Sequence, residues 1–188
     1  MKLCALILLL LALAVPVSAA NHDESVDGDI STDPNAPTPL ILSVGGNKIT
    51  GTTGNIGGII DRDYVTFNIP PGFALTGLNL LAFSPNNLAF ASFNTGTTSF
   101  VPSGATALLF LAGIHIDGSM LGTNLMPVFV TTSVTGNSLP APMLGPGDYT
   151  FLIQQTSPIT QSYSLDFILE GTVATSSTTW GGIKALYR

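Results

Sequence analysis

The chain has 188 residues, of which 45% are apolar and only 9% charged, whereas a typical soluble domain is about 25% charged. Five Lys and Arg residues against eleven Asp and Glu residues give a formal net charge of −6, which excludes an electrostatic nucleic-acid binder. The single Cys excludes a disulfide scaffold and a Cys-rich zinc site, and the apolar content excludes a wholly disordered chain.

The first twenty residues have the pattern of a secretory signal peptide. Lys2 supplies a positive charge, an apolar run follows from Leu3 to Val15, and small residues at 17–20 suit a cleavage site. We therefore expect residues 1–20 to be removed and the product to be secreted or held at the cell surface, in an extracellular or periplasmic location. No later segment is apolar over the length of a membrane span, so we expect no transmembrane segment after cleavage.

Composition divides the remaining chain into four parts. Residues 21–39 form an acidic, Pro-rich leader, and residues 40–170 have the size of a single domain. Residues 171–179 have the Ser/Thr-rich composition of a linker, and residues 180–188 form a short tail with an apolar stripe at helical spacing. We expect the tail either to dock on the domain or stay disordered, with a sorting or secretion role as the alternative.

The domain is rich in short apolar runs with a period of two, which predicts strands with one face on a core. Alternation is clearest at Val65–Ile69, Tyr149–Ile153 and Tyr163–Leu169. Further strands are expected at Leu40–Val44, Lys48–Gly51, Leu75–Phe83, Leu88–Phe93, Thr106–Ala112 and Pro127–Thr131. Gly- and Pro-rich turns separate these runs, at 45–47, 70–72, 84–87 and 142–147. The spacing predicts an all-β, antiparallel β-sandwich of about 8–9 strands.

Three segments in this order resemble the bacterial pre-peptidase C-terminal domain family, which is related to collagen-binding domains of secreted proteases. Asp61 to Gly72 resembles the family's "D-x-D-x-(aromatic/V)-x-F … P-x-G" strand. Gly147 to Gln155 resembles its "G-x-Y-x-(L/I)-x-(V/I)" strand, and Tyr163 to Phe167 its closing "Y-x-L-x-F" strand. The resemblance implies a jelly-roll-like sandwich and a bacterial source.

Calcium is the cofactor for which the sequence offers ligands. Asp27 and Asp29, and likewise Asp61 and Asp63, stand two residues apart, so in an extended segment each pair points the same way. The resemblance implies calcium between the N-terminal linker and a loop of the sandwich, which here indicates these two segments with Glu24 as an additional ligand. The alternative is a solvated acidic leader beside an exposed turn, partly compensated by Arg62.

Catalysis has weaker support in the sequence. His115 and Asp117 could belong to a Ser-His-Asp set, but no G-x-S-x-G elbow occurs, and a His on a strand is more often structural. The six acids of the domain show no pattern that indicates a pair of hydrolytic carboxylates. Phe90, Phe93 and Phe100 could form a platform that stacks on a sugar or a peptide, although a sandwich core also needs such residues.

These observations predict a secreted, non-enzymatic β-sandwich module, stabilised by calcium, that binds an extracellular polysaccharide, a protein or the cell envelope. The first alternative is a structural component of the extracellular matrix that associates with itself through exposed strand edges. The second alternative is a hydrolase that uses His115.

Overall fold

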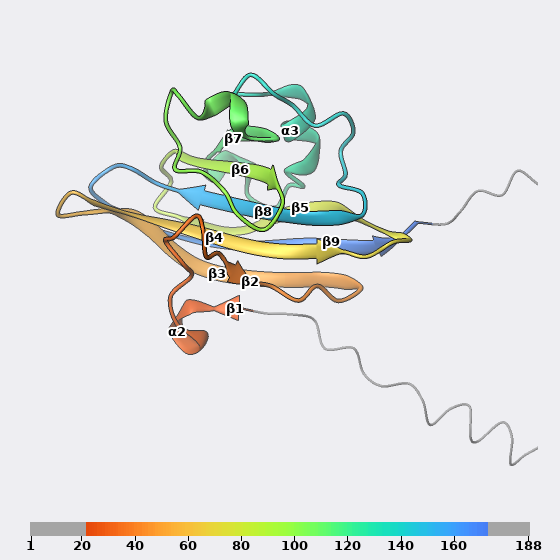
Figure 1. Cartoon of the computed structure of the whole chain (residues 1–188). Helices are drawn as coiled ribbons and strands as arrows, with labels where there is room; N and C mark the ends of the chain where they lie inside the picture. The colour runs from red at the N-terminus through yellow and green to blue at the C-terminus, as the bar shows by residue number, and fades with distance from the viewer. Residues whose placement is uncertain (1–21, 173–188) are drawn as a thin grey trace, which may run out of the picture.

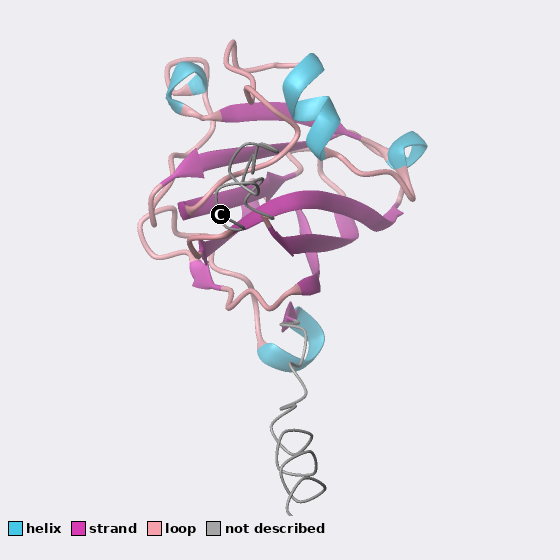
Figure 2. Ribbon diagram, turned by 90° about the vertical axis from the view of Figure 1, so that its right-hand side faces the viewer, coloured by secondary structure: helices cyan, strands magenta, loops and turns pink. Residues whose placement is uncertain are grey.

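The computed structural model describes residues 22–172 and confirms an all-β, mainly antiparallel fold (Figures 1 and 2). The strands are β1 (His22–Asp23), β2 (Thr38–Pro39), β3 (Gly45–Ile56), β4 (Ile59–Ile69), β5 (Phe73–Ser84), β6 (Ala89–Thr95), β7 (Ala112–Ile116), β8 (Gly147–Gln154) and β9 (Thr160–Gly171). The helical turns are α2 (Glu24–Asp27), α3 (Met126–Thr131), η1 (Ala107–Leu109) and η2 (Gly118–Met120). The predicted signal peptide, the 180–188 tail and most of the 171–179 linker lie outside the described residues.

The strands form one curled path in the order β5-β9-β3-β4-β8-β6-β7, with β1 added parallel to β3 and β2 parallel to β4. Strands β3 and β4 pair only beside their hairpin, from Gly54 opposite Asp61 to Ile56 opposite Ile59. Beyond that point β3 continues along β9 while β4 continues along β8, so the sheet folds over on itself. The jelly-roll detail of the expected sandwich stays a prediction.

Aromatic rings fill the space between the two halves of the curled sheet. The Phe167 ring of β9 lies 5.5 Å from the Phe67 ring of β4 and 5.3 Å from the Phe151 ring of β8, measured between centroids. Phe93 of β6 lies 5.2 Å from Phe151 and 4.9 Å from Phe129 of α3. These strands are not all hydrogen-bonded neighbours, so the rings join the halves through the core.

The outer face of the β4-β8-β6-β7 half, the face turned away from this core, carries a second, smaller apolar cluster. Tyr64, Leu152 and Phe110 are buried there, and Phe90 packs against them. Phe110 comes from the long connection between β6 and β7, which folds back over the sheet. Leu152 is therefore buried on one face while its neighbours Phe151 and Ile153 are buried on the other.

Seven of the nine predicted strand segments overlap strands of the structure, and the remaining two are wrong. Residues 40–44 form no strand, although the Leu40 amide donates to the Thr66 carbonyl at 2.8 Å. The predicted turn at 45–47 is instead the start of β3, where Asn47 is buried and its side-chain amide donates to the Phe167 carbonyl at 2.9 Å. The 106–112 segment overlaps a strand only at Ala112, because most of it is the turn η1.

The strand predicted at 127–131 is wrong, because α3 occupies it. Met126 and Phe129 are its buried side chains, and their spacing of three residues is helical. Pro127 stands in the first turn, where its missing N–H is not needed. The β-branched residues of this run favoured a strand, but the positions of the two core contacts decided the outcome. None of the helices within 22–172 is long and apolar enough to cross a membrane.

The acidic leader is packed against the sheet, from His22 and Asp23 beside β3 to Thr38 and Pro39 beside β4. Ile30 is completely buried in the main core, and the Tyr64 amide donates to the Ser31 carbonyl at 3.0 Å. Thr38 and Pro39 pair with Val65 and Thr66. The leader therefore lies beside β4, the strand that carries both Asp61 and Asp63.

Candidate cation site

The leader delivers one carboxylate directly to the sheet. Glu24 begins the short turn α2, which is capped by the Asp23 side chain through the Ser25 amide at 3.0 Å. The Glu24 Oε1 atom accepts from the Ile30 amide at 3.2 Å, and its Oε2 atom accepts from the Thr52 amide at 2.7 Å. A single side chain thus connects the leader to β3.

Gly51 of β3 makes room for this arrangement. A Cβ atom at Gly51 would lie 2.8 Å from the Tyr163 hydroxyl oxygen and 2.9 Å from Glu24 Cδ, closer than real Cβ contacts permit. The Glu24 carboxylate and the Tyr163 phenol therefore approach the same point on the strand. A side chain at this position would force one of them away.

Asp63 of β4 completes the inner part of the cluster. Tyr163, which is 1% exposed, donates its hydroxyl proton to Asp63 Oδ2 at 2.7 Å. Asp63 is itself only 1% exposed, and its second oxygen, Oδ1, is buried without a hydrogen-bond partner. A buried carboxylate oxygen without a partner is costly, so this atom marks a place where a proton or a cation would be stabilising.

Like charges and burial act together on the acids of this cluster. Burial, followed by the charges of Asp29 and Glu24, raises the pKa of Asp61 from its ordinary value of 3.8 to about 6. Burial is also the leading cause that raises the pKa of Asp63 well above its ordinary value, with the Glu24 charge next. The pKa of Glu24 is raised by burial as well. The charges of Glu24 and Asp29 therefore oppose the ionisation of Asp61 and Asp63, the two carboxylates of β4.

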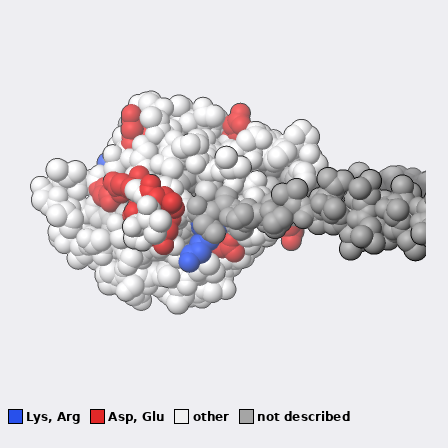
Figure 3. All heavy atoms as spheres, turned by 90° about the horizontal axis from the view of Figure 1, so that it is seen from below, with Lys and Arg blue, Asp and Glu red and all other residues white. Residues whose placement is uncertain are grey.

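Within residues 22–172, no Lys or Arg side chain neutralises these acids. Between residues 22 and 172 the only Lys and Arg residues are Lys48 and Arg62. Arg62 Nε donates to the Gln154 side-chain oxygen at 2.8 Å, and Lys48 is exposed. The alternative in which Arg62 compensates the acidic turn therefore has no support in its hydrogen bonds. Figure 3 shows the largest group of acidic side chains on the side of the molecule that carries α2, with other acids scattered around it and a basic side chain nearby.

Further oxygen atoms lie at the same end of the curled sheet. Thr53, opposite Gln161 on β9, donates its hydroxyl to the Asp61 carbonyl at 2.6 Å. Gln161 is fully buried, and its side-chain oxygen has no hydrogen-bond partner. Gln161 and Tyr163 stand two residues apart on β9 and point to the same face. The neighbourhood of the carboxylates thus contains a second buried acceptor without a partner.

Of the five predicted ligands, Glu24 and Asp63 both lie beside the Tyr163 hydroxyl, and the charges of Asp61 and Asp29 act on the pKa of Asp63. Asp27 instead accepts from the Asp23 amide at 2.8 Å within the leader itself. Within residues 22–172, no three His, Cys, Asp or Glu side chains already stand in a ligating arrangement. The acids are neighbours around an open cluster rather than a finished coordination shell.

The donor set suits a hard cation. All the groups are oxygens, and Ca²⁺ takes six to eight oxygen ligands in a flexible geometry that combines carboxylates, carbonyls and water. Asp63 Oδ1 and the Gln161 side-chain oxygen are both buried without a hydrogen-bond partner, and a cation would stabilise either atom. Glu24, Asp29, Asp61 and Asp63 are the residues that would hold the ion, and the ion would supply the charge that the cluster lacks.

The raised pKa values predict an unusual pH dependence in calcium-free protein. Burial raises the pKa of Asp61 from 3.8 to about 6, so between these pH values the folded state holds a proton that the unfolded chain releases. The free energy of unfolding should therefore fall as the pH rises from about 4 to about 6, and Asp63 should extend the fall upward. Urea unfolding in metal-free buffer at several pH values measures this slope. A stability that increases over this window would contradict the prediction.

The residues considered for catalysis are not assembled into a site. Asp117 is the cap of η2 and accepts from the Ser119 amide at 2.8 Å, while exposed His115 lies beside the Phe90 ring, 6.2 Å between centroids. Among the three phenylalanines considered as a platform, Phe93 belongs to the main core, while Phe90 lies on the outer face and Phe100 is 37% exposed.

Sequence reasoning missed three members of the site, namely Gly51, Gln161 and Tyr163. The alternation along β9 places Gln161 and Tyr163 on the inner face, but it does not indicate which strand lies opposite. The available signal was that Gln161, a polar residue, and Tyr163 both occupy inward positions of the same strand.

Comparison with known proteins gives no family for the chain, because no protein-family model and no curated protein matches it.

Proposed function

We propose that the chain is an exported, non-catalytic β module whose N-terminal segment is clamped to the sheet by calcium, and which binds a polymer or protein outside the cell. The observation that carries the proposal is the buried oxygen of Asp63, without a partner, amid the charges of Glu24, Asp29 and Asp61. The resemblance to pre-peptidase C-terminal domains supports the same placement of calcium. The signal-peptide pattern supports an environment in which calcium is available.

The clamp would act through the leader. Glu24 accepts amide protons from Ile30 in the leader and Thr52 in β3, so an ion on its carboxylate would reinforce both contacts. Ile30, which anchors the leader in the main core, would be held in place by the same ion. The proposed role of calcium is therefore to hold the leader against the sheet.

The covered sheet edges favour a binding module over self-association. Strand β5, at one end of the path, is bridged by Leu144 and by Asn124. Strand β7, at the other end, has its Gly113 carbonyl occupied by the Val134 amide at 2.9 Å. Edges of this kind leave few backbone groups for a second copy.

Thermal unfolding tests the calcium clamp. An ion that binds only the folded state at 100 times its dissociation constant stabilises that state by about 2.7 kcal/mol. For a chain of this size, the corresponding increase in melting temperature is about 5–10 °C. Hydrogen exchange at the Ile30 and Thr52 amides should slow in parallel, because both donate to Glu24.

Magnesium provides the matched control. It demands a smaller, near-octahedral shell and gives up its water reluctantly, so it should raise the melting temperature less than calcium does at equal concentration. Identical melting curves in chelator and in excess calcium would reject the clamp.

A further inference from the structure

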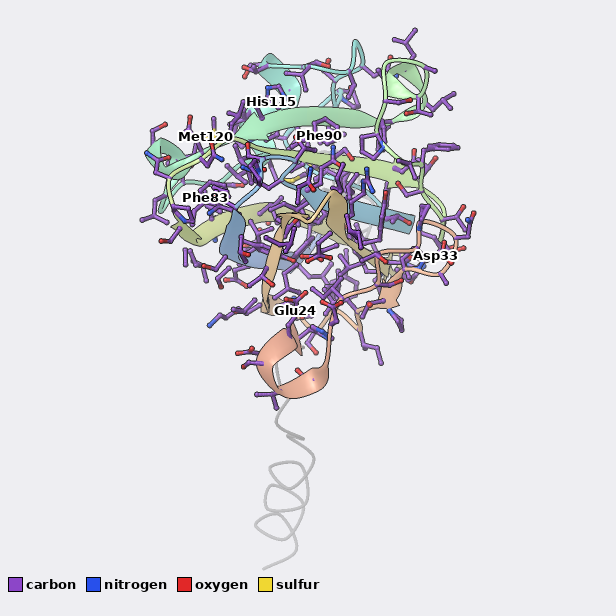
Figure 4. The ribbon with its side chains drawn as sticks, turned by 90° about the vertical axis from the view of Figure 1, so that its left-hand side faces the viewer. Glu24, Asp33, Phe83, Phe90, His115 and Met120 are labelled. Carbon is purple, nitrogen blue, oxygen red and sulfur yellow. The ribbon has the colours of Figure 1, made fainter. Side chains whose placement is uncertain are left out.

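A second site lies on the outer face of the sheet, away from the acidic cluster. Directly paired residues of antiparallel strands lie on the same face. Phe90 of β6 stands between Gln154 of β8 and His115 of β7. Figure 4 shows Phe90 and His115 close together on the half of the molecule opposite Glu24. These three residues form the floor of a groove that runs across the strands.

The groove encloses a cavity of about 400 Å³, within the range of small-molecule sites. The connection between β6 and β7 supplies one wall, with Ser103 and Gly104 facing the space. Thr135 and Thr156 stand at its other borders. Among the residues that the structure describes, no Asp, Glu, Lys or Arg lines the groove, which favours an uncharged ligand.

The floor of the groove is held in a fixed arrangement. A Cβ atom at Gly113 would lie 2.4 Å from the Thr135 methyl carbon and 2.9 Å from the Phe90 ring, so only glycine lets both pack here. Phe110 meets the Phe90 ring edge-on at 5.8 Å. Arg62 occupies the Gln154 side-chain oxygen, which leaves the amide nitrogen of Gln154 as the group that can donate to a ligand.

We propose that this groove binds a neutral sugar residue at the end of an extracellular glycan. A sugar ring has hydroxyls that donate and accept, and an apolar C–H face that packs on an aromatic ring. The groove matches both, with the Gln154 amide and the His115 imidazole beside the Phe90 ring. An apolar peptide side chain would instead cover these polar groups without satisfying them. The proposal names the partner of the binding role proposed above and does not depend on the calcium clamp.

In the experiment, neutral oligosaccharides that end in glucose, galactose, mannose or N-acetylglucosamine are titrated into the exported protein in the presence of calcium. An uncharged peptide is the comparison probe. At least one sugar should bind, and Gly104→Trp should weaken it by about tenfold or more, since the indole would occupy the groove. His115→Ala should weaken it too, because an exposed donor on the floor is lost.

Gly145→Trp is the matched control. A Cβ atom at Gly104 or at Gly145 meets nothing within 4 Å, and Gly145 does not line the groove, so both variants should fold and only the first should lose binding. Failure of every sugar to bind the folded protein, or equal binding by Gly104→Trp, would overturn the inference. If the peptide binds and Gly104→Trp blocks that binding, the groove is a peptide site, which overturns the sugar inference but keeps the proposed binding function. The effect of calcium on the melting temperature tests the calcium clamp independently of these results.

Discussion

Replacing Phe151 with Ala is expected to lower the free energy of unfolding by about 3–5 kcal/mol, the usual cost of truncating a buried Phe. The Phe151 ring is fully buried and lies 5.2 Å from Phe93 and 5.3 Å from Phe167. It therefore connects β8 to both halves of the curled sheet. The lost ring would leave a cavity that its rigid aromatic neighbours fill poorly. Urea unfolding monitored by circular dichroism measures the change.

Phe100→Ala is the matched control for this core variant. Phe100 is 37% exposed and touches the Phe110 ring edge-on at 6.1 Å, outside the main core. Its removal should cost markedly less. Equal losses from the two substitutions would show that the aromatic contacts between the halves do not dominate the stability of the fold.

Local pattern predicted most of the strands because one face of each has to be buried. The alternation of Val65, Phe67 and Ile69 reappears as three buried side chains on β4, and the same holds for β9. The pattern gave the wrong secondary structure where a short apolar run was compatible with both a strand and a helix. At 126–131 the apolar residues suited either a strand or a helix, and the contacts of Met126 and Phe129 with the core favoured the helix.

The acidic pairs were visible in the sequence, but their surroundings were not. The spacing of Asp61 and Asp63 predicted that their side chains lie on the same face. Both residues are on β4, where positions two apart share a face. That the leader lies on β3, and that Tyr163 of β9 reaches Asp63, depends on contacts 28 and 100 residues apart along the chain. Such contacts arise from the curling of the sheet. A pattern of period two carries no information about them.

The groove was predicted even less well, for a similar reason. Phe90 and His115 are paired through β6 and β7, whereas Gln154 joins them only because β8 lies on the other side of β6. The loop that walls the groove was partly expected to be a strand, over 106–112. This groove depends on which strands pair, on their register and on a loop that folds back over the sheet. It can be recognised only when the topology of the sheet is known.

Asp63→Asn should abolish most of the calcium effect while raising the stability of the calcium-free protein near pH 7. The amide oxygen can still accept from the Tyr163 hydroxyl, but the side chain no longer carries a charge that burial and Glu24 oppose. The decline in stability with rising pH should therefore become shallower. With one carboxylate removed, the expected calcium gain of about 5–10 °C should fall to about 1 °C or less. Melting curves in chelator and in calcium measure both effects.

Asp148→Asn is the control for this substitution, because that exposed carboxylate accepts from Asn68 at the far end of β8 and should leave the calcium gain intact. If Asp63→Asn does not fold, Asp61→Asn offers a second test, since Asp61 is only partly buried and shares the same charges. A full calcium gain in folded Asp63→Asn and Asp61→Asn would mean that calcium binds elsewhere. The leader would then be held without an ion, by Ile30 and the Glu24 hydrogen bonds.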